Sequence, residues 1–193
     1  MTLAQPSMTT ARLLLAPVEA RLAQSMLDYQ LRNRDHLAPW DPTPAERFFT
    51  LSYWVGRCRQ RQREWQDGRC AAYVLLRREA PERVIGSLSL SNIQRGVAQS
   101  ATLGYSIDAG CQGQGLMHEA LEAVLDMAFD TLLLHRIQAN YQPHNQRSAA
   151  LLRRLGFVIE GRASRYLFLN GGWRDHILTA LVNPRFDPDN LLL

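Results

Sequence analysis

The chain has 193 residues, about the size of one domain, and 46% of them are hydrophobic, which is enough for a buried core. Its apolar runs do not reach the ~18 residues of a transmembrane helix. The first residues also lack the basic-then-apolar pattern of a signal or transit peptide, so we expect neither. The net charge is +4 and all 22 basic residues are arginine, a modest balance that specifies no anionic partner. The three cysteines are odd in number and lack metal-ligand spacing, so we expect reduced thiols in a cytoplasmic protein.

Apolar spacing and turn residues predict an alternation of helices and strands. In chain order they are a strand at Arg12–Pro17, helices at Glu19–Leu37 and Ala45–Trp65, strands at Ala72–Arg77, Val84–Leu90 and Thr102–Ile107, a helix at about Gln114–Thr131, a strand at Arg136–Tyr141, a helix at Asn145–Leu155, and strands from Phe157 and Trp173. The Pro-rich segment His36–Pro44 separates the first two helices, and "LNGGW" at Leu169–Trp173 is typical of a hairpin turn. We see no repeat and no linker, so we expect one α/β domain with a mixed sheet.

The segment "DAGCQGQGLMHEAL" (Asp108–Leu121) joins a predicted strand to a predicted helix. A glycine-rich loop at that junction can bind an anion, because the first amides of a helix have no intrahelical acceptor and the helix dipole adds positive charge. The dinucleotide-binding pattern requires a third glycine where this chain has His118, and a P-loop requires a lysine that is absent. Gly113 and Gly115 therefore belong either to a different kind of pyrophosphate loop or to a simple helix entry.

The same segment resembles the Gln/Arg-x-x-Gly-x-Gly/Ala motif of the GCN5-related N-acetyltransferases (GNAT), with Gln112 at its first position and Gly115 at its fourth. Met117 replaces the usual glycine or alanine, as in the "QGxGLM" form of the RimJ-type ribosomal-protein alanine N-acetyltransferases. The resemblance covers roughly Thr10 to Pro184. Its further segments are "HLAPW" (His36–Trp40), "SNIQRG" (Ser91–Gly96), "HRIQANYQPHNQRSAALLRRLGF" (His135–Phe157) and "EGRASRYLFLNGGWRDHILTAL" (Glu160–Leu181).

This resemblance implies the GNAT fold, with a mixed central sheet splayed between its fourth and fifth strands and helices on both faces. It implies a single N-acetyltransferase domain over residues 1–193, with a core at about 10–184. Acetyl-CoA would be the co-substrate, with no metal, since no zinc-type Cys or His spacing is present. A bulge in the fourth strand, Leu103–Ile107, would open the sheet for the pantetheine arm beside Gly104. The implied acetyl-CoA-binding residues are Gly104, Tyr105, Ser106, Ile107, Gln112, Gly113, Gln114, Gly115, Leu116, Met117 and Asn145.

For catalysis, the resemblance to the related RimL-type enzymes implies that Ser148 assists the leaving thiolate. Asn145 would bind the pantetheine region, although it is also a good N-cap for the following helix. Those enzymes carry a glutamate general base where this chain has Leu167. The remaining candidates are better explained structurally, so the base stays unassigned and a water relay is favoured. They are Glu160, Asp175, His144 and His176.

The substrate implied by the resemblance is the N-terminal α-amino group of alanine, or a similar small residue, on a ribosomal protein. Trp40, Asn92 and Tyr141 would line its groove, although aromatic residues more often belong to a core. Two alternatives stay open: acetylation of a small-molecule amine, and a ribosome- or RNA-associated factor with little activity, which the arginines at 57–63 motivate. We expect no membrane and no specific DNA as partners, and the sequence favours no oligomeric state.

Overall fold

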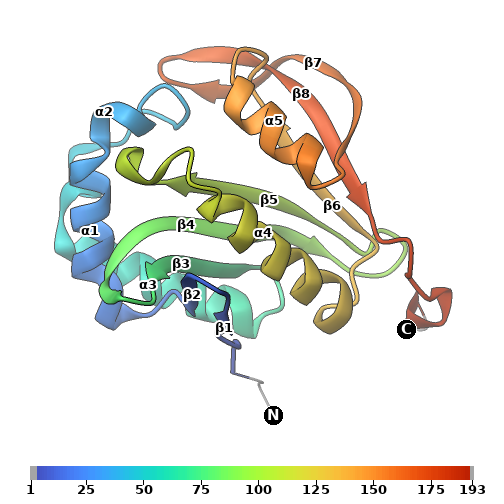
Figure 1. Cartoon of the computed structure of the whole chain (residues 1–193). Coiled ribbons are helices and arrows are strands. Elements are labelled where there is room, and N and C mark those ends of the chain that lie inside the picture. Colours follow the sequence, from blue (N-terminus) through green and yellow to red (C-terminus); the bar gives the residue numbers. More distant parts are fainter. Residues whose placement is uncertain (1–3, 192–193) are drawn as a thin grey trace.

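The computed structural model describes residues 4–191, through which an eight-stranded sheet runs in the order β1-β2-β3-β4-β5-β6-β8-β7 (Figure 1). The strands are β1 Met8–Thr9, β2 Leu13–Pro17, β3 Ala71–Arg77, β4 Ala80–Gln94, β5 Ser100–Ile107, β6 Arg136–Tyr141, β7 Val158–Leu169 and β8 Gly172–Val182. The α-helices are α1 Ala23–Arg32, α2 Arg34–Leu37, α3 Leu51–Gln66, α4 Leu116–Asp126 and α5 Gln146–Arg154. Short 3₁₀ turns are η1 Ala20–Leu22, η2 Glu46–Phe49, η3 Ala109–Cys111 and η5 Pro188–Leu191, and a π-helical turn, η4, covers Met127–Thr131.

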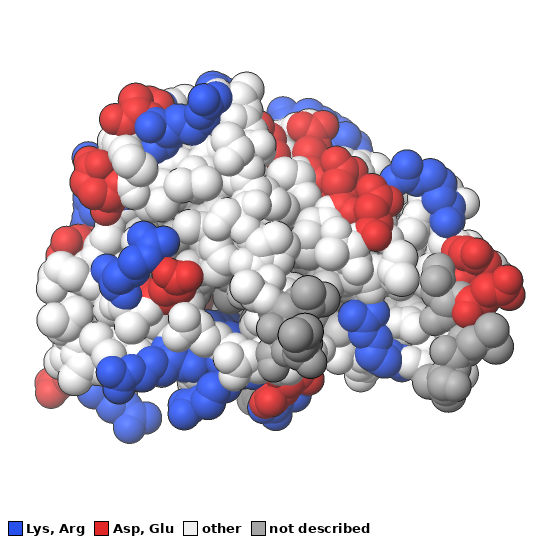
Figure 2. Space-filling view, turned by 90° about the horizontal axis from the view of Figure 1, so that it is seen from below, with Lys and Arg blue, Asp and Glu red and all other residues white. Residues whose placement is uncertain are grey.

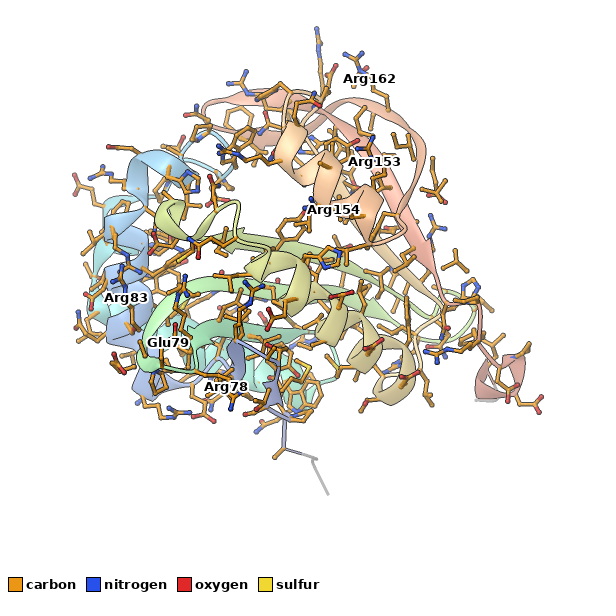
Figure 3. All side chains as sticks on the ribbon, in the orientation of Figure 1. Arg78, Glu79, Arg83, Arg153, Arg154 and Arg162 are labelled. Atoms are coloured by element: carbon orange, nitrogen blue, oxygen red, sulfur yellow. The ribbon has the colours of Figure 1, made fainter. Side chains whose placement is uncertain are left out.

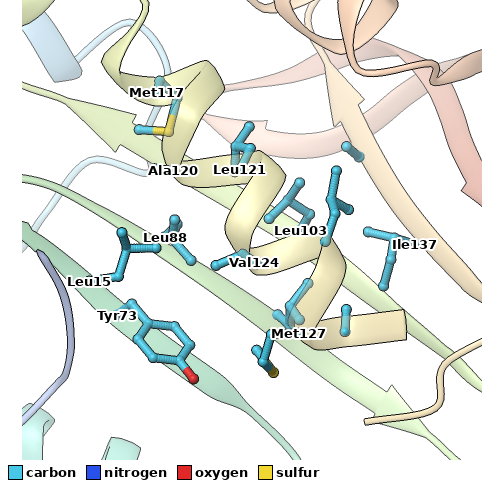
Figure 4. Packing of buried hydrophobic residues seen from close by; sticks show 14 of the residues in the cluster. Leu15, Tyr73, Leu88, Leu103, Met117, Ala120, Leu121, Val124, Met127 and Ile137 are labelled. Carbon is cyan, nitrogen blue, oxygen red and sulfur yellow. The ribbon is translucent and has the colours of Figure 1, made fainter. Parts of the chain in front are cut away.

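Helices pack on both faces of this sheet, because the strands alternate apolar residues between two separate clusters. On β3, Tyr73 and Leu75 join the cluster that contains α4 and α5, whereas Val74 and Leu76 join the cluster that contains α1 and α3. Figure 4 shows α4 laying its apolar stripe across the sheet. Leu121, at the centre of that stripe, is fully buried, so truncating it to alanine would cost about 2–5 kcal/mol.

The sheet opens between β5 and β6, its one parallel pair of neighbouring strands. Their pairing covers Ser100–Thr102 against Arg136–Gln138, yet β5 continues to Ile107 and β6 to Tyr141. Figure 1 shows the two strands diverging along their second halves. The backbone groups that face this opening are therefore not used by a strand ladder there.

The prediction of a bulge at Leu103–Ile107 is wrong. The pairing of β5 with β4 runs without interruption from Gly86↔Ile107 to Ser91↔Thr102, and Gly104 lies opposite Ser89 in that regular register. The register shift lies at the other end, between Ser91 and Gln94. The opening thus results from the directions of β5 and β6 rather than from an extra residue in β5.

Several element bounds also differ from the sequence-based expectation. The helix expected from Ala45 begins at Leu51, because Thr50 has an extended backbone and its side chain accepts a hydrogen bond from the Tyr53 amide (3.3 Å). The helix expected to reach Thr131 changes at Met127 to a π-helical turn. The predicted hairpin turn is confirmed: Asn170 and Gly171 both have positive φ (46° and 72°), as a type I′ turn requires.

Charge on the surface is mixed rather than gathered into one patch. On the face shown in Figure 2, arginines and acidic residues both surround a central area without charged side chains. On α3, Arg57 and Arg61 lie 3.9 Å and 2.8 Å from Glu64, so part of the predicted arginine stripe is balanced within its own helix. Among residues 4–191, no helix combines the length and the apolar character needed to cross a membrane.

Candidate active site

The glycine loop follows β5 at the mouth of the opening and is anchored to α1. The Asp108 carboxylate accepts a hydrogen bond from the Gly110 amide (3.2 Å) and from Arg32 Nε (2.7 Å). The Ala109 amide donates to the side-chain oxygen of the buried residue Asn33 (2.9 Å). Burial alone would raise the pKa of Asp108, but these bonds, above all that from Arg32, outweigh it and lower the pKa. The loop is therefore fixed before any ligand arrives.

Gly113 and Gly115 both have positive φ (72° and 75°), a backbone conformation that glycine adopts at little cost. Gly115 is the N-cap of α4, and the first helical bond runs from the Glu119 amide to its carbonyl (3.1 Å). The amides of residues 116–118 precede that ladder and, with the helix dipole, form an anion site at the opening. Leu116 and Met117 bury their side chains in the core (1% and 7% exposed), so only their main chain is available to a ligand.

Two glutamines flank the first loop glycine and are held by basic residues from distant parts of the chain. Gln112 accepts a hydrogen bond from Arg147 of α5 (2.6 Å) and its amide nitrogen lies 3.1 Å from His36. Gln114 accepts from Arg77 at its side chain (2.7 Å) and from Arg12 at its carbonyl (2.8 Å). Three of these partners are arginines, of which Arg12 and Arg77 are also paired with Glu119 and Glu79 (2.7 Å and 3.3 Å), so Arg147 contributes most of the positive charge at the loop.

Arg147 is a site residue that the sequence analysis missed. It lies in the first turn of α5, beside Ser148, and its charge reaches across the opening to the loop. Its place in the "HNQRS" segment was the available signal. Arg153 and Arg154 occupy the last turn of the same helix (Figure 3), where cations complement the C-terminal end of the helix dipole.

Ser148 and Tyr105 meet across the opening. The Tyr105 hydroxyl of β5 lies 2.6 Å from the Ser148 hydroxyl of α5, within hydrogen-bonding distance. Burial raises the pKa of Tyr105 to about 12, a shift that the bond to Ser148 partly opposes. The phenol is therefore protonated near neutral pH. Asn145 caps α5 as predicted, because its side chain accepts from the Ser148 amide (3.1 Å) and so fixes the turn that carries Ser148.

The opposite face of the opening is polar. Leu103, Tyr105 and Ile107 of β5 point toward the α4–α5 cluster, so the alternate residues of β5 point to the side of α1. The same alternation holds on β4 and β6. The residues of this polar face, which we call the acceptor face, are Ser87, Ser89, Ser91, Thr102, Gly104, Ser106, Gln138 and Asn140.

The acceptor face is bordered by aromatic residues. Tyr29 of α1 donates to Ser106 (2.9 Å), and Asn140 donates to the Tyr166 hydroxyl of β7 (3.3 Å). Trp40 is half-buried and stacks on His144, with ring centroids 5.3 Å apart. Gly104 and Ser106, expected to bind the cofactor, thus lie on the face opposite Tyr105 and Ile107.

The two other residues expected to line a substrate groove lie elsewhere. Tyr141 is 9% exposed and belongs to the apolar cluster of α4 and α5. Asn92 is exposed and has positive φ (52°), beyond Ser91, where the pairing of β4 with β5 becomes irregular.

The candidate bases from the sequence already have partners. Glu160 forms an ion pair with Arg136. The Asp175 carboxylate accepts hydrogen bonds from Arg162 (2.7 Å) and from the Arg165 amide (2.9 Å). The hydrogen bond from the Arg165 amide contributes most to lowering the pKa of Asp175.

The histidines also have contacts within the chain. His176 is buried (3% exposed), with its ring nitrogen Nδ1 3.1 Å from the Arg174 carbonyl. His144 is the ring that stacks on Trp40. The two carboxylates and Nδ1 of His176 are thus engaged within the chain, whereas stacking on Trp40 does not engage the ring nitrogens of His144.

Two surface cavities lie away from the Tyr105–Ser148 pair, although the second borders Asp108 and Gly110 of the loop. One of about 420 Å³ follows α3 from Arg47 to Gln60, and one of about 280 Å³ lies between the β3–β4 hairpin and η3, beside Arg77 and Cys111. Neither has a wall from β6 or α5, so neither spans the place where Tyr105 and Ser148 meet. Among the described residues, no cluster of three His, Cys, Asp or Glu side chains could hold a metal ion.

In this site, β5 separates from its parallel neighbour β6 and is followed by an anion-binding glycine loop, an arrangement suited to a cofactor with a phosphate group and an extended arm. The family model of the acetyltransferase (GNAT) domain matches residues 12–158, so the chain belongs to the GNAT acetyltransferase family. The fold and family expected from the sequence are thereby confirmed.

Particular relatives narrow the comparison. The chain is 42% identical over 181 residues to the [ribosomal protein uS5]-alanine N-acetyltransferase of Escherichia coli (strain K12), covering 94% of this chain and 93% of that one. The solved ribosomal-protein-S5-alanine acetyltransferase of Vibrio fischeri superposes with a TM-score of 0.90 at 37% identity, covering 95% of this chain and 100% of that one. Mycobacterium smegmatis RimJ, solved in complex with a CoA-disulfide, gives a TM-score of 0.85 at 30% identity, with 96% and 92% covered.

Proposed function

We propose that this enzyme transfers the acetyl group of acetyl-CoA to the N-terminal α-amino group of alanine on ribosomal protein uS5. The observation that carries the proposal is the 42% identity, over 94% of this chain, to an acetyltransferase named for that substrate. The geometry is consistent with it, since an anion site and a hydroxyl pair lie on one side of the opening and a polar face on the other. With a ribosomal protein as substrate, the reaction would take place in the cytoplasm, and the partner would be the free protein or the ribosome.

The loop would hold the acetyl-CoA pyrophosphate. The amides of residues 116–118 supply donors, the positive φ of Gly113 and Gly115 lets the main chain approach a phosphate, and Arg147 adds charge. Gln112 and Gln114, already oriented by arginines, would fix the loop rather than move to meet the ligand. The pantetheine arm would then lie along the edge of β5 that β6 leaves unpaired beyond Thr102, near Asn145.

The Tyr105–Ser148 pair would protonate the leaving thiolate. Its two hydroxyls are 2.6 Å apart, so a proton given by one can be replaced through the other. A thiol has a pKa near 8.5, so its thiolate leaves with modest help. We therefore assign Ser148 as the group nearest the sulfur and Tyr105 as its proton source.

The acceptor amine would approach from the acceptor face. Its nitrogen must lose a proton before it attacks, and an N-terminal α-amine, with a pKa of ~7.7–8, does so far more readily than lysine at ~10.4. Direct attack in a ternary complex, without an acetyl-enzyme, fits a site whose two sides carry different chemistry. The polar acceptor face offers hydrogen-bonding side chains to a peptide backbone.

The test uses acetyl-CoA with three synthetic peptides that share an internal lysine. One begins with free alanine, one with N-blocked alanine, and one with a free bulky residue. We expect mass spectrometry to find one acetyl group, at the α-amine, on the first peptide alone. Equal reaction of free and blocked peptides would show lysine acetylation and refute the proposal, as would preferred turnover of spermidine over every peptide.

A further inference from the structure

Asp41, in the loop after α2, is a carboxylate with no ion-pair partner among residues 4–191. The described part of the chain contains five carboxyls whose pKa departs clearly from the ordinary value. Glu64, Asp108, Glu119 and Asp175 are lowered, and each has an arginine partner. Asp41 differs, because burial raises its pKa and no ion pair reaches it within residues 4–191.

The backbone at Asp41 is held from three sides. Its amide donates to the Leu37 carbonyl (3.2 Å), which ties it to the end of α2. Its carbonyl accepts from the Asn170 amide (3.2 Å), in the turn between β7 and β8. The preceding residues are fixed to the segment after β6, because Gln142 donates to the Pro39 carbonyl (3.1 Å) and Trp40 stacks on His144. Figure 1 shows this loop reaching from α2 toward the β7–β8 turn.

These contacts place Asp41 over the mouth of the opening. The contacts at His144 and Gln142 lie directly after β6 ends at Tyr141. On the β5 side, burial first and the charge of Asp41 in addition raise the pKa of Tyr29, whose hydroxyl is bonded to Ser106. The charge of Asp41 thus acts on a hydroxyl bonded to Ser106 of the acceptor face, while the residue itself remains solvent-exposed and accessible to a substrate.

We propose that Asp41 binds the α-ammonium group of the substrate and acts as the general base of the acetyl transfer. This inference rests on the proposed function and adds the base that the sequence analysis left unassigned. An unpaired carboxylate in a chain with 22 arginines is suited to receive a cation from outside the chain. Its raised affinity for a proton improves it as a base.

The proton balance closes with this assignment. Asp41 takes one proton from the ammonium and passes it to solvent, and the neutral nitrogen then forms a bond to the thioester carbon. The intermediate's nitrogen gives its second proton to Asp41 as the carbon–sulfur bond breaks. The thiolate takes one proton from the Tyr105–Ser148 pair, which solvent replenishes. Two protons leave nitrogen and one reaches sulfur, so one is released.

Titratable and charged groups lie on the elements around Asp41. The charge of Asp41 acts on Tyr29 of α1, His144 stacks on the neighbouring Trp40, and Arg174 donates to the carbonyl of Asn170 (3.0 Å), whose amide donates to the Asp41 carbonyl. Tyr29 has its pKa raised and stays neutral. We therefore expect kcat/KM to change near pH ~8 as the substrate amine titrates. Below that pH, Asp41 would determine how much activity remains.

The experiment compares Asp41→Asn and Asp41→Glu with Asp35→Asn, an exposed acid on α2 that serves as the matched control. We expect Asp41→Asn to bind acetyl-CoA normally but to lose about 100-fold or more in kcat/KM for the alanine peptide at pH 7. The loss should shrink as the pH rises above ~8, where the amine is already neutral. Asp41→Glu should recover part of the activity, and Asp35→Asn should match the wild type.

A binding measurement keeps this test separate from the proposed function. Calorimetry compares the alanine peptide with its analogue in which hydrogen replaces the amine. We expect the wild type to prefer the amine peptide and Asp41→Asn to lose that preference. A wild type without the preference, or an Asp41→Asn variant with unaltered pH dependence, would overturn the role of Asp41. An inactive wild type that still prefers the amine peptide would instead refute only the proposed function.

Discussion

A negative charge at the N-cap of α4 should expel the cofactor, and a matched pair of variants can isolate that effect. Gly115 has φ 75° and ψ 0°, so any side chain there adopts a left-handed backbone at a cost of about 1–2 kcal/mol. Gly115→Gln and Gly115→Glu share that strain and nearly the same shape. They differ by one negative charge beside the amides that would bind the pyrophosphate.

The magnitude follows from Coulomb's law. A glutamate carboxylate roughly 6 Å from a phosphate, at an effective dielectric constant of 20, is disfavoured by on the order of 3 kcal/mol. Gly115 is exposed and a Cβ there would lie 3.4 Å from Arg12 Nη2, so solvent, salt and this arginine reduce the effect. We therefore expect Gly115→Glu to bind acetyl-CoA about 10- to 100-fold more weakly than Gly115→Gln.

Isothermal titration calorimetry at low and high salt measures both affinities, and thermal unfolding measures the shared strain. Each variant should lose about 2–8 °C in Tm relative to wild type, by the same amount. The gap in affinity between them should narrow at high salt, because screening weakens the repulsion. If the glutamate and glutamine variants bind acetyl-CoA equally, the phosphates do not lie at this helix end.

Three further outcomes are expected. Arg147→Ala should raise the Kd for acetyl-CoA roughly ten-fold by removing one charge-assisted contact, while Arg153→Ala at the other end of α5 leaves it unchanged; equal effects would remove Arg147 from the site. Ser148→Ala should lower kcat about ten-fold or more with little change in peptide KM, measured by thiol release, and an unchanged kcat would exclude it from protonating the thiolate. Asp108 has a lowered pKa in the folded state, so it stabilises the fold above its unfolded pKa of ~3.9 and loses that contribution as pH falls through the folded value. Asp108→Asn should thus be less stable than wild type at pH 6, and the difference in Tm should shrink as the pH falls below ~3.9; a constant difference in Tm would contradict this.

Local chemistry was readable from the sequence. Asn145 was predicted as a helix cap, and its side chain does accept the Ser148 amide, because a cap depends on residues three positions apart. The Asn170–Gly171 turn follows from the same kind of short-range rule. The anion-binding loop was recognised from its glycines and its place between a strand and a helix.

Long-range partners could not be predicted from the sequence. Arg147 meets Gln112 across 35 positions. The charge of Asp41 acts on Tyr29 because the fold brings the loop after α2 close to α1 and the β7–β8 turn. A glutamate-to-leucine change at position 167 indicated that a base was missing at its usual place. The sequence could not indicate that Asp41, near the other side of the opening, has no arginine ion-pair partner among the described residues.

In the first turn of α4, the side chains and the main-chain amides face different partners, so each can change without affecting the other. The core selects the side chains of Leu116 and Met117, both buried, whereas a phosphate would meet only their main-chain amides. Methionine can therefore replace the family's usual small residue at 117 without altering what the ligand encounters, provided that the packing beneath accepts it. Sequence differences at position 117 therefore reflect changes in core packing and carry no information about affinity for the cofactor.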